Sequence, residues 1–345
     1  MPHLMANLSL DLDNKWSYLK THGDPGWESF PSYLDVVVPR FLDVLGDLGL
    51  RMTVFVVGQD AALARNRSAL AAIADAGHEI GNHSFKHEPW LHLYSEDELE
   101  AELSAAEDAI ETATGVHPTG FRGPGFSLSP AVLTSLARRN YQYDASTLPT
   151  FLGPLARLYY FRRAHLSSGQ RTERKRLFGG WSEGCRPVRP YWWQSEGDAA
   201  DGIANSMRLL EIPVTTMPLV RSPFHVSYLV YLFQFSRVVA WRYWRLATSL
   251  CRLTGVEPSL LLHPLDFLGH EDEPDLAFFP GMRLAAVDKI AFVREILRDF
   301  AWRFEVVPMG EHADRLAQQD LPIRRLKPVV QQPREPVLTA KVFSS

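Results

Sequence analysis

The chain has 345 residues, of which 46% are hydrophobic and 22% are charged, so it can bury a sizeable core. Its formal net charge of −4 provides no broad basic field, and we expect no nucleic-acid partner. Cys185 and Cys251 match no metal-binding spacing, which predicts two free thiols in a reducing compartment.

The first residues lead almost directly into a predicted strand at Asp11. They lack the basic segment and the spaced apolar run of a signal peptide. We therefore expect a cytoplasmic protein.

Strand and helix patterns alternate over residues 7–145. Strands are expected around Asp11 and at 52–57, 79–82 and 118–121, and helices at 33–48, 61–76, 95–114 and 130–139. The run 52–57 is nearly all apolar, as in a buried parallel strand. Such alternation is typical of a parallel α/β sheet or barrel.

The rhythm changes after residue 150. Residues 150–207, which are rich in Arg, Trp, Tyr, Gly and Pro, and 222–253, which are apolar and basic, are interpreted as insertions. Further strands are expected at 209–215, 259–262 and 304–307, and a helix at 284–300. Composition predicts a flexible tail at 320–345, which leaves one domain over 1–319.

Two short motifs carry metal-binding side chains. Asp11 and Asp13 are two apart on a predicted strand and so share one face. His83 and His87 are four apart, so one helical turn would place both imidazoles on one face. Asp13, His83 and His87 then supply three ligands to a divalent metal, and Asp11 is left as a general base.

Other candidate groups also fall at predicted strand ends, where α/β barrels carry their catalytic residues. Arg122 is placed to stabilise the ionised form of Asp11. His263 ends an apolar strand and could act as a general acid. Asp144 ends another predicted strand, where it could orient Arg122 or tune His263.

In this order the motifs resemble the five motifs of the polysaccharide deacetylases, carbohydrate esterase family 4. Asp11 and Asp13 match the first motif, and His83-Ser84-Phe85-Lys86-His87 matches the second in full. Arg122-Gly123-Pro124-Gly125-Phe126 is similar to the third, Tyr141 to Ser146 to the fourth, and Leu260 to His263 to the fifth. Most members have adjacent aspartates, and the Asp-x-Asp spacing here looks more like an intracellular subgroup.

The resemblance implies a distorted (β/α) barrel of the deacetylase type, carrying large insertions after residue 150. It also implies one divalent metal, most often Zn²⁺, with Co²⁺, Mn²⁺ and Ni²⁺ as alternatives. The implied reaction removes an N-acetyl or similar N-acyl group from an amino sugar, with Asp11 as base and His263 as acid. Gly125, through its backbone N–H, and Phe126 are expected at the substrate.

Three other functions remain open at this stage. One is hydrolysis of a non-sugar linear or cyclic amide. Another is an iron oxygenase, which shares the two-histidine, one-carboxylate ligand set. The third is a non-catalytic glycan-binding barrel, which the filled catalytic positions disfavour.

Some segments suggest what the substrate is attached to. Trp16 and Trp90 could stack on sugar rings, although such residues also build cores. Residues 222–253, continued as a helix, have a basic arc and an apolar side, which fits either a membrane-surface helix at the inner membrane face or a helix packed on the barrel. The basic run 171–176 could meet a phosphate. Together these features suggest a lipid-linked or nucleotide-linked glycan precursor, and they leave the oligomeric state unknown.

Overall fold

A computed structural model describes residues 4–153, 181–195 and 207–326 of the chain. These residues form a ten-stranded sheet in the order β10-β6-β7-β5-β4-β3-β2-β1-β8, with β9 (Glu305–Val307) paired to the start of β1 (Met5–Asp11). The basic run 171–176 lies outside the described residues.

The predicted rhythm of strands and helices is confirmed in the first half of the chain. β1 is buried along its whole length, and β2 (Thr53–Val56) and β3 (Glu79–Asn82) extend the sheet in parallel. β4 (Gly120–Phe121) and β5 (Tyr143–Asp144) continue it. The apolar run expected at 52–57 is thus a buried parallel strand, because Val54 and Val56 on one face and Phe55 on the other each pack in a hydrophobic core.

Helices follow these strands as expected. The chain between β1 and β5 forms α1 (Lys15–His22), α2 (Leu34–Leu48), α3 (Gly58–Ala62), α4 (Arg67–Asp75), α5 (Glu96–Thr114) and α6 (Pro130–Arg138). α5 begins with the predicted capping box of Ser95 and Glu98. The single helix expected at 61–76 is instead divided into α3 and α4, because Leu63 is extended.

The second half of the chain closes the sheet. β7 (Arg208–Glu211) pairs in parallel with β5 and antiparallel with β6 (Tyr191–Gln194). The chain continues from β7 to Thr215, whose N–H donates to the carbonyl of Ser259 at the start of β8 (Ser259–Leu262). The sheet therefore curves round from β8 through β1 and β5 until it meets β8 again, which makes it a distorted α/β barrel.

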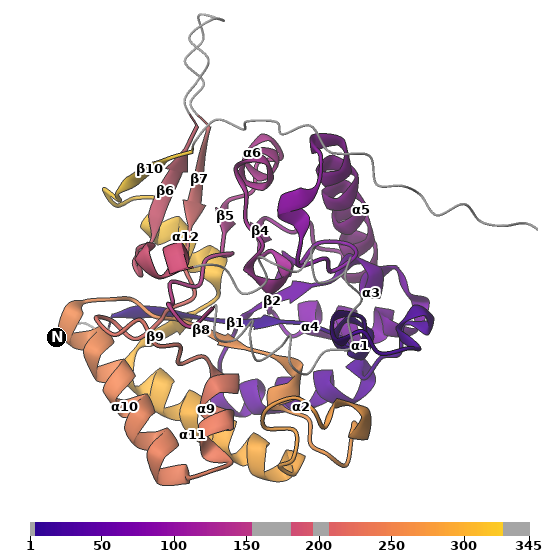
Figure 1. Ribbon diagram of the computed structural model, residues 1–345, viewed down its shortest axis with the longest axis vertical. Helices are drawn as coiled ribbons and strands as arrows, with labels where there is room; N and C mark the ends of the chain where they lie inside the picture. The colour runs from indigo at the N-terminus through magenta and orange to yellow at the C-terminus, as the bar shows by residue number, and fades with distance from the viewer. Residues whose placement is uncertain (1–3, 154–180, 196–206, 327–345) are drawn as a thin grey trace, which may run out of the picture.

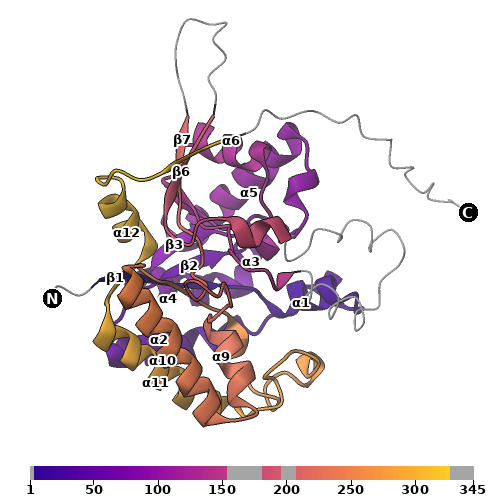
Figure 2. The same cartoon turned by 60° about the vertical axis from the view of Figure 1, so that its left-hand side comes forward.

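Two helices, α9 (Val226–Phe233) and α10 (Arg237–Thr254), connect β7 to β8. Figures 1 and 2 show them together with α11 (Ala286–Arg303), on the side of the sheet away from α5 and α6. Trp244 and Cys251 of α10 are fully buried in the main core. The segment expected as an insertion at 222–253 is therefore built into the helical layer of the barrel.

The described start of the predicted tail, residues 320–326, differs from the flexible segment that its composition predicts. After α12 (Met309–Leu316), residues Ile323–Arg325 form β10 and pair with β6. All three side chains of β10 are exposed, so the strand is held by backbone pairing and leaves no apolar pattern in the sequence. No helix in the described ranges is long and apolar enough to cross a membrane.

Candidate active site

The predicted site residues gather at the carboxyl ends of the parallel strands. Asp11 and Asp144 are the last residues of β1 and β5. His83, Arg122 and His263 are the first residues after β3, β4 and β8. The sequence positions at strand ends are thus confirmed, and the curved sheet brings groups that are 250 residues apart to one edge.

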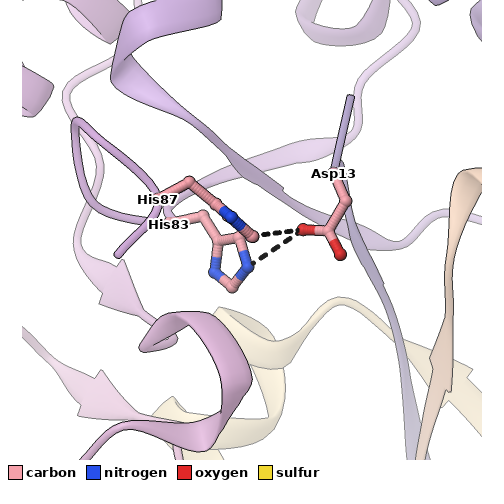
Figure 3. A group of neighbouring side chains, drawn as sticks. All are labelled: Asp13, His83 and His87. Carbon is pink, nitrogen blue, oxygen red and sulfur yellow. Dashed lines mark hydrogen bonds and ion pairs between the residues drawn. The ribbon is translucent and has the colours of Figure 1, made fainter. Parts of the chain in front are cut away.

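Asp13, His83 and His87 form a compact group of metal-ligand type. Nε2 of His87 lies 2.8 Å from Oδ1 of Asp13, and Nε2 of His83 lies 3.3 Å from the same oxygen. Candidate ligand atoms from the three residues all lie within 4.8 Å of one another. Figure 3 shows both imidazole rings directed at the single carboxylate.

The predicted helical turn between the two histidines is wrong. Residues 83–87 form a loop after β3, in which Ser84 and His87 have the left-handed backbone angles φ 61° and 53°. The Asn82 side chain accepts a hydrogen bond from the N–H of Ser84 at 2.8 Å and fixes the start of this loop. The backbone conformation of this loop, and not a helical turn, therefore brings the two imidazoles together.

Electrostatics of the group suit a cation. Burial alone would raise the pKa of Asp13, but the charges and hydrogen bonds of His87 and His83 outweigh it and lower that pKa well below its usual range. Burial works against the charged form of His83, yet the charges of Asp11 and Asp13 raise its pKa overall. Two carboxylates therefore create a negative site around the imidazole nitrogens.

The donor set fits a divalent metal. Nδ1 of His83 lies 2.6 Å from the carbonyl oxygen of Arg122 and donates to it, which directs the lone pair of Nε2 toward Asp13. Nδ1 of His87 is buried, and within the described part of the chain it has no hydrogen-bond partner. Two imidazole nitrogens and one carboxylate oxygen are a donor set typical of catalytic zinc sites.

Asp11 lies beside this group but is paired with Arg122 instead. Nη1 of Arg122 donates to Oδ1 of Asp11 at 2.7 Å and to the hydroxyl of Ser9 at 3.0 Å. The arginine is fully buried, its Nε donates to the Ala145 carbonyl, and its guanidinium lies over the Phe55 ring. It therefore holds the Asp11 carboxylate in one orientation.

His263 is held by groups that the motifs do not include. Its Nδ1 lies 2.9 Å from the hydroxyl of Ser227, in the first turn of α9. That hydroxyl donates to Oδ2 of Asp266 at 3.0 Å, and the same oxygen accepts the N–H of His263 at 2.8 Å. Since the serine proton points to Asp266, Nδ1 of His263 carries the proton in their shared bond and Nε2 remains available.

His225, at the start of α9, is a second group that sequence reasoning missed. Its ring centroid lies 6.1 Å from that of His263. Burial and the charge of His263 lower the pKa of His225 to about 3, while the charge of Asp11 acts in the opposite direction. His225 is therefore neutral at pH 7 and lies near both proposed proton-transfer groups. No periodicity or motif in 222–253 identifies it or Ser227.

Comparison with known proteins agrees with this geometry. Residues 24–143, which include His83, His87 and Arg122, match the family model described as polysaccharide deacetylase. This part of the chain therefore resembles the polysaccharide deacetylase family. The narrower assignment to an intracellular Asp-x-Asp subgroup stays a prediction.

Relatives with named activities match the same part of the chain. A peptidoglycan deacetylase of Helicobacter pylori is 29% identical over 128 residues, which are 37% of this chain and 41% of that protein. A peptidoglycan-N-acetylglucosamine deacetylase of Bacillus cereus is 33% identical over 86 residues, 25% of this chain and 30% of the relative. The chain thus spans less than half the length of these relatives.

A solved structure supports the fold over a larger part of the chain. The structure of a candidate polysaccharide deacetylase from Mycobacterium smegmatis superposes with a TM-score of 0.60 at 20% identity. The superposition covers 97% of this chain and 96% of that one. The deacetylase-type barrel is therefore shared, including the part beyond residue 143.

Asp144, in the segment that resembles the fourth deacetylase motif, makes no hydrogen bond to Arg122 or His263 within the described part of the chain. Its carboxyl accepts the Ser146 hydroxyl at 2.5 Å, and that hydroxyl accepts the N–H of Gly123 at 2.8 Å. Burial raises the pKa of both Asp144 and its neighbour Glu211, and the Asp144 charge raises that of Glu211 further. Asp144 therefore supports the turn after Arg122, and only its charge acts on the arginine itself.

Trp16 cannot stack on a substrate, contrary to the prediction. It is 1% exposed, and its ring packs edge-on against His87 with centroids 6.3 Å apart. Its Nε1 donates to Oδ1 of Asp60, which also accepts from Asn14. Trp16 thus packs behind the His87 ring and is buried there by Phe30, Asp60 and His87.

The remaining predicted substrate residues lie at the surface of the same edge. Gly125 and Phe126 have left-handed backbone angles, φ 58° and 60°, in the turn after Arg122. Both are partly exposed, as is Trp90 beyond the histidine loop. Their roles in binding and in oxyanion stabilisation stay predictions.

Proposed function

We propose that this protein is a metal-dependent hydrolase that removes an N-acetyl group from an amino sugar. The observation that carries the proposal is the convergence of Asp13, His83 and His87 beside the Asp11–Arg122 pair. His263 lies near by on the same strand edge. The family, and the deacetylases named among its relatives, support the chemical class.

Asp13, His83 and His87 would hold the metal. Their nitrogen and oxygen donors suit Zn²⁺, and Co²⁺, Mn²⁺ or Ni²⁺ accept the same set. When bound, such an ion polarises the amide carbonyl and lowers the pKa of water toward about 7. The His83–Arg122 hydrogen bond fixes one ligand ring before the ion arrives, which reduces the cost of ordering the site.

Asp11 takes the proton from the attacking water. Its carboxylate is oriented by Arg122 and is 5% exposed, so few competing waters surround it. As the water oxygen bonds to the carbonyl carbon, the proton passes to Asp11. The Arg122 side chain keeps the carboxylate fixed through its hydrogen bond to Oδ1 of Asp11.

His263 delivers a proton to the departing nitrogen. Ser227 and Asp266 hold its Nδ1–H, so Nε2 is the nitrogen that faces the reaction. The carbon–nitrogen bond then breaks to give acetate and the free amine. An amine is a poor leaving group unless it is protonated, and this is the reason the site needs an acid as well as a base.

Acetate release from N-acetylglucosamine oligosaccharides tests the proposal. We expect EDTA to abolish this activity and added Zn²⁺ to restore it. The Asp13→Ala variant should be inactive because it loses a metal ligand. Asp35→Asn, at an exposed position of α2, is the matched control and should behave as wild type. Unchanged acetate release by fully metal-free protein would contradict metal dependence, and hydrolysis of a non-sugar amide alone would contradict the sugar substrate.

A further inference from the structure

The helical hairpin of α9 and α10 has an unusual charge pattern. Residues 222–256 contain four arginines and no acidic residue. The hairpin is the connection between β7 and β8, and its first turn contacts His263 through Ser227. The rest of the hairpin lies outside the active site just described.

The outer face of this hairpin is apolar as well as basic. Phe235, in the turn between the helices, is 70% exposed, and Leu253 near the end of α10 is 82% exposed. Val238, Val239 and Leu246 are each more than half exposed. The buried side of α10 is instead made by Ala240, Trp244, Ala247, Thr248 and Cys251. Packing on the barrel therefore leaves the large aliphatic side chains of α10 in water.

Three arginines share this outer face. At 100° per residue, the positions from 238 to 253 that are exposed on α10 fall within an arc of about 140°. Around this arc the residues follow in the order Arg252, Arg245, Val238, Arg242, Leu253, Leu246 and Val239. The arginines therefore lie toward one side and most of the aliphatic residues toward the other. Within residues 4–153, 181–195 and 207–326, no carboxylate pairs with these three arginines, whereas Arg237 pairs with Glu295.

We propose that this outer face, formed by Phe235 and the exposed arc of α10, binds the surface of an anionic lipid bilayer. A helix with exposed aliphatic and aromatic side chains beside unpaired arginines suits the boundary between acyl chains and anionic headgroups. A second copy of the chain is a poorer fit, because a two-fold contact would bring two sets of arginines together. The contact is peripheral and needs no membrane-spanning helix.

The hairpin would also bring the active site close to the bilayer surface. α9 has eight residues, so Ser227 at the site and Phe235 at the bilayer are separated by roughly 12 Å along the helix. An amino sugar carried on a lipid would be presented within this distance. That consequence rests on the proposed function, whereas the bilayer contact does not.

Vesicle flotation tests the contact without measuring activity. The full chain is mixed with vesicles of phosphatidylcholine alone, or with vesicles in which about 30% of the lipid is phosphatidylglycerol to mimic an anionic leaflet. We expect flotation only with the anionic vesicles, reduced by high salt. Phe235→Ser combined with Leu246→Ser should weaken the apparent affinity at least about tenfold, and so should Arg242→Gln with Arg245→Gln.

Two matched variants complete the experiment. Val287→Ser removes an aliphatic side chain that is 71% exposed on α11, and Arg67→Gln removes an exposed charge on α4, so both should float as wild type does. Absence of wild-type flotation on anionic vesicles would overturn the proposal. So would unchanged flotation of the Phe235 and Arg242 double variants, or a concentration-dependent dimer that these variants abolish without any vesicle binding.

Discussion

The two halves of the candidate site are built differently. The metal-side cluster, Asp11, Asp13, His83, His87 and Arg122, comes from the ends of β1, β3 and β4, and its members contact one another directly. The acid-side cluster, His225, Ser227, His263 and Asp266, combines a strand end with the first turn of α9. Here the histidine reaches the carboxylate through a serine.

This difference shows which functional residues a sequence can reveal. Each member of the metal-side cluster has an ionisable or metal-binding side chain and lies at or just after a strand end, within a short motif. In the acid-side cluster only His263 does so. Ser227 and His225 gain a role only because α9 packs against β8, and nothing in their own surroundings in the sequence indicates that contact.

The largest effect is expected at the centre of the acid-side cluster. His263→Gln keeps a side chain that can hydrogen-bond Ser227 but cannot deliver a proton at neutral pH. We expect the kcat for an N-acetyl sugar to fall by about 10² to 10⁴-fold. An activated ester such as 4-nitrophenyl acetate, whose leaving group needs no proton, should lose much less. An equal loss on both substrates would show that His263 is not the acid.

A smaller effect, on stability, is expected below the metal-side cluster. Burial raises the pKa of Asp60 to about 7, although Asn14 and Trp16 donate to it. The unfolded chain ionises this group near pH 4, whereas the folded protein keeps it protonated until about pH 7. Stability is therefore lost as the pH rises between about 4 and 7, and the loss levels off once the folded protein also ionises. Asp60→Asn lacks this titration.

In metal-free protein, the free energy of unfolding of Asp60→Asn relative to wild type should therefore increase by about 3 kcal/mol between pH 5 and pH 8. Denaturant unfolding at the two pH values measures this difference. A relative stability that is independent of pH would mean that Asp60 is ionised in the folded protein across the whole range.

The smallest catalytic effect is expected at the serine of the acid-side cluster. Ser227→Ala leaves His263 and Asp266 in place but removes the hydroxyl that joins them. We expect kcat to fall about tenfold with little change in KM, because one neutral hydrogen bond is lost. Ser227→Thr keeps the hydroxyl and should restore most of the rate. If the threonine variant were as slow as the alanine variant, the role of the hydroxyl would be packing rather than positioning.

Much of the fold was predictable because α/β barrels repeat a simple pattern. The apolar run at 52–57, the capping box at Ser95 and the strand before His263 each correspond to one local physical rule. The same rules located Asp11, His83 and Arg122 at strand ends. Local patterns are sufficient there because each strand brings its own terminal residue to the common edge.

Prediction was wrong where a residue depends on distant neighbours. The histidine pair has helical spacing, yet Asn82 and two left-handed residues shape it as a loop. Trp16 lies close in sequence to the aspartates, yet Asp60 and His87 bury it. In α10 the buried side is made by Trp244 and small residues, so the apolar pattern of 222–253 did not show which residues pack on the barrel.

The division of work between Asp11 and Asp13 is the central claim, and metal content measured together with activity tests it most directly. Asp11→Asn should bind one metal ion per chain, as wild type does, and lose about 10³-fold in kcat because the base is gone. Asp13→Asn should lose both metal and activity. An Asp11→Asn protein that fails to bind metal, or that keeps full activity with metal bound, would contradict the account.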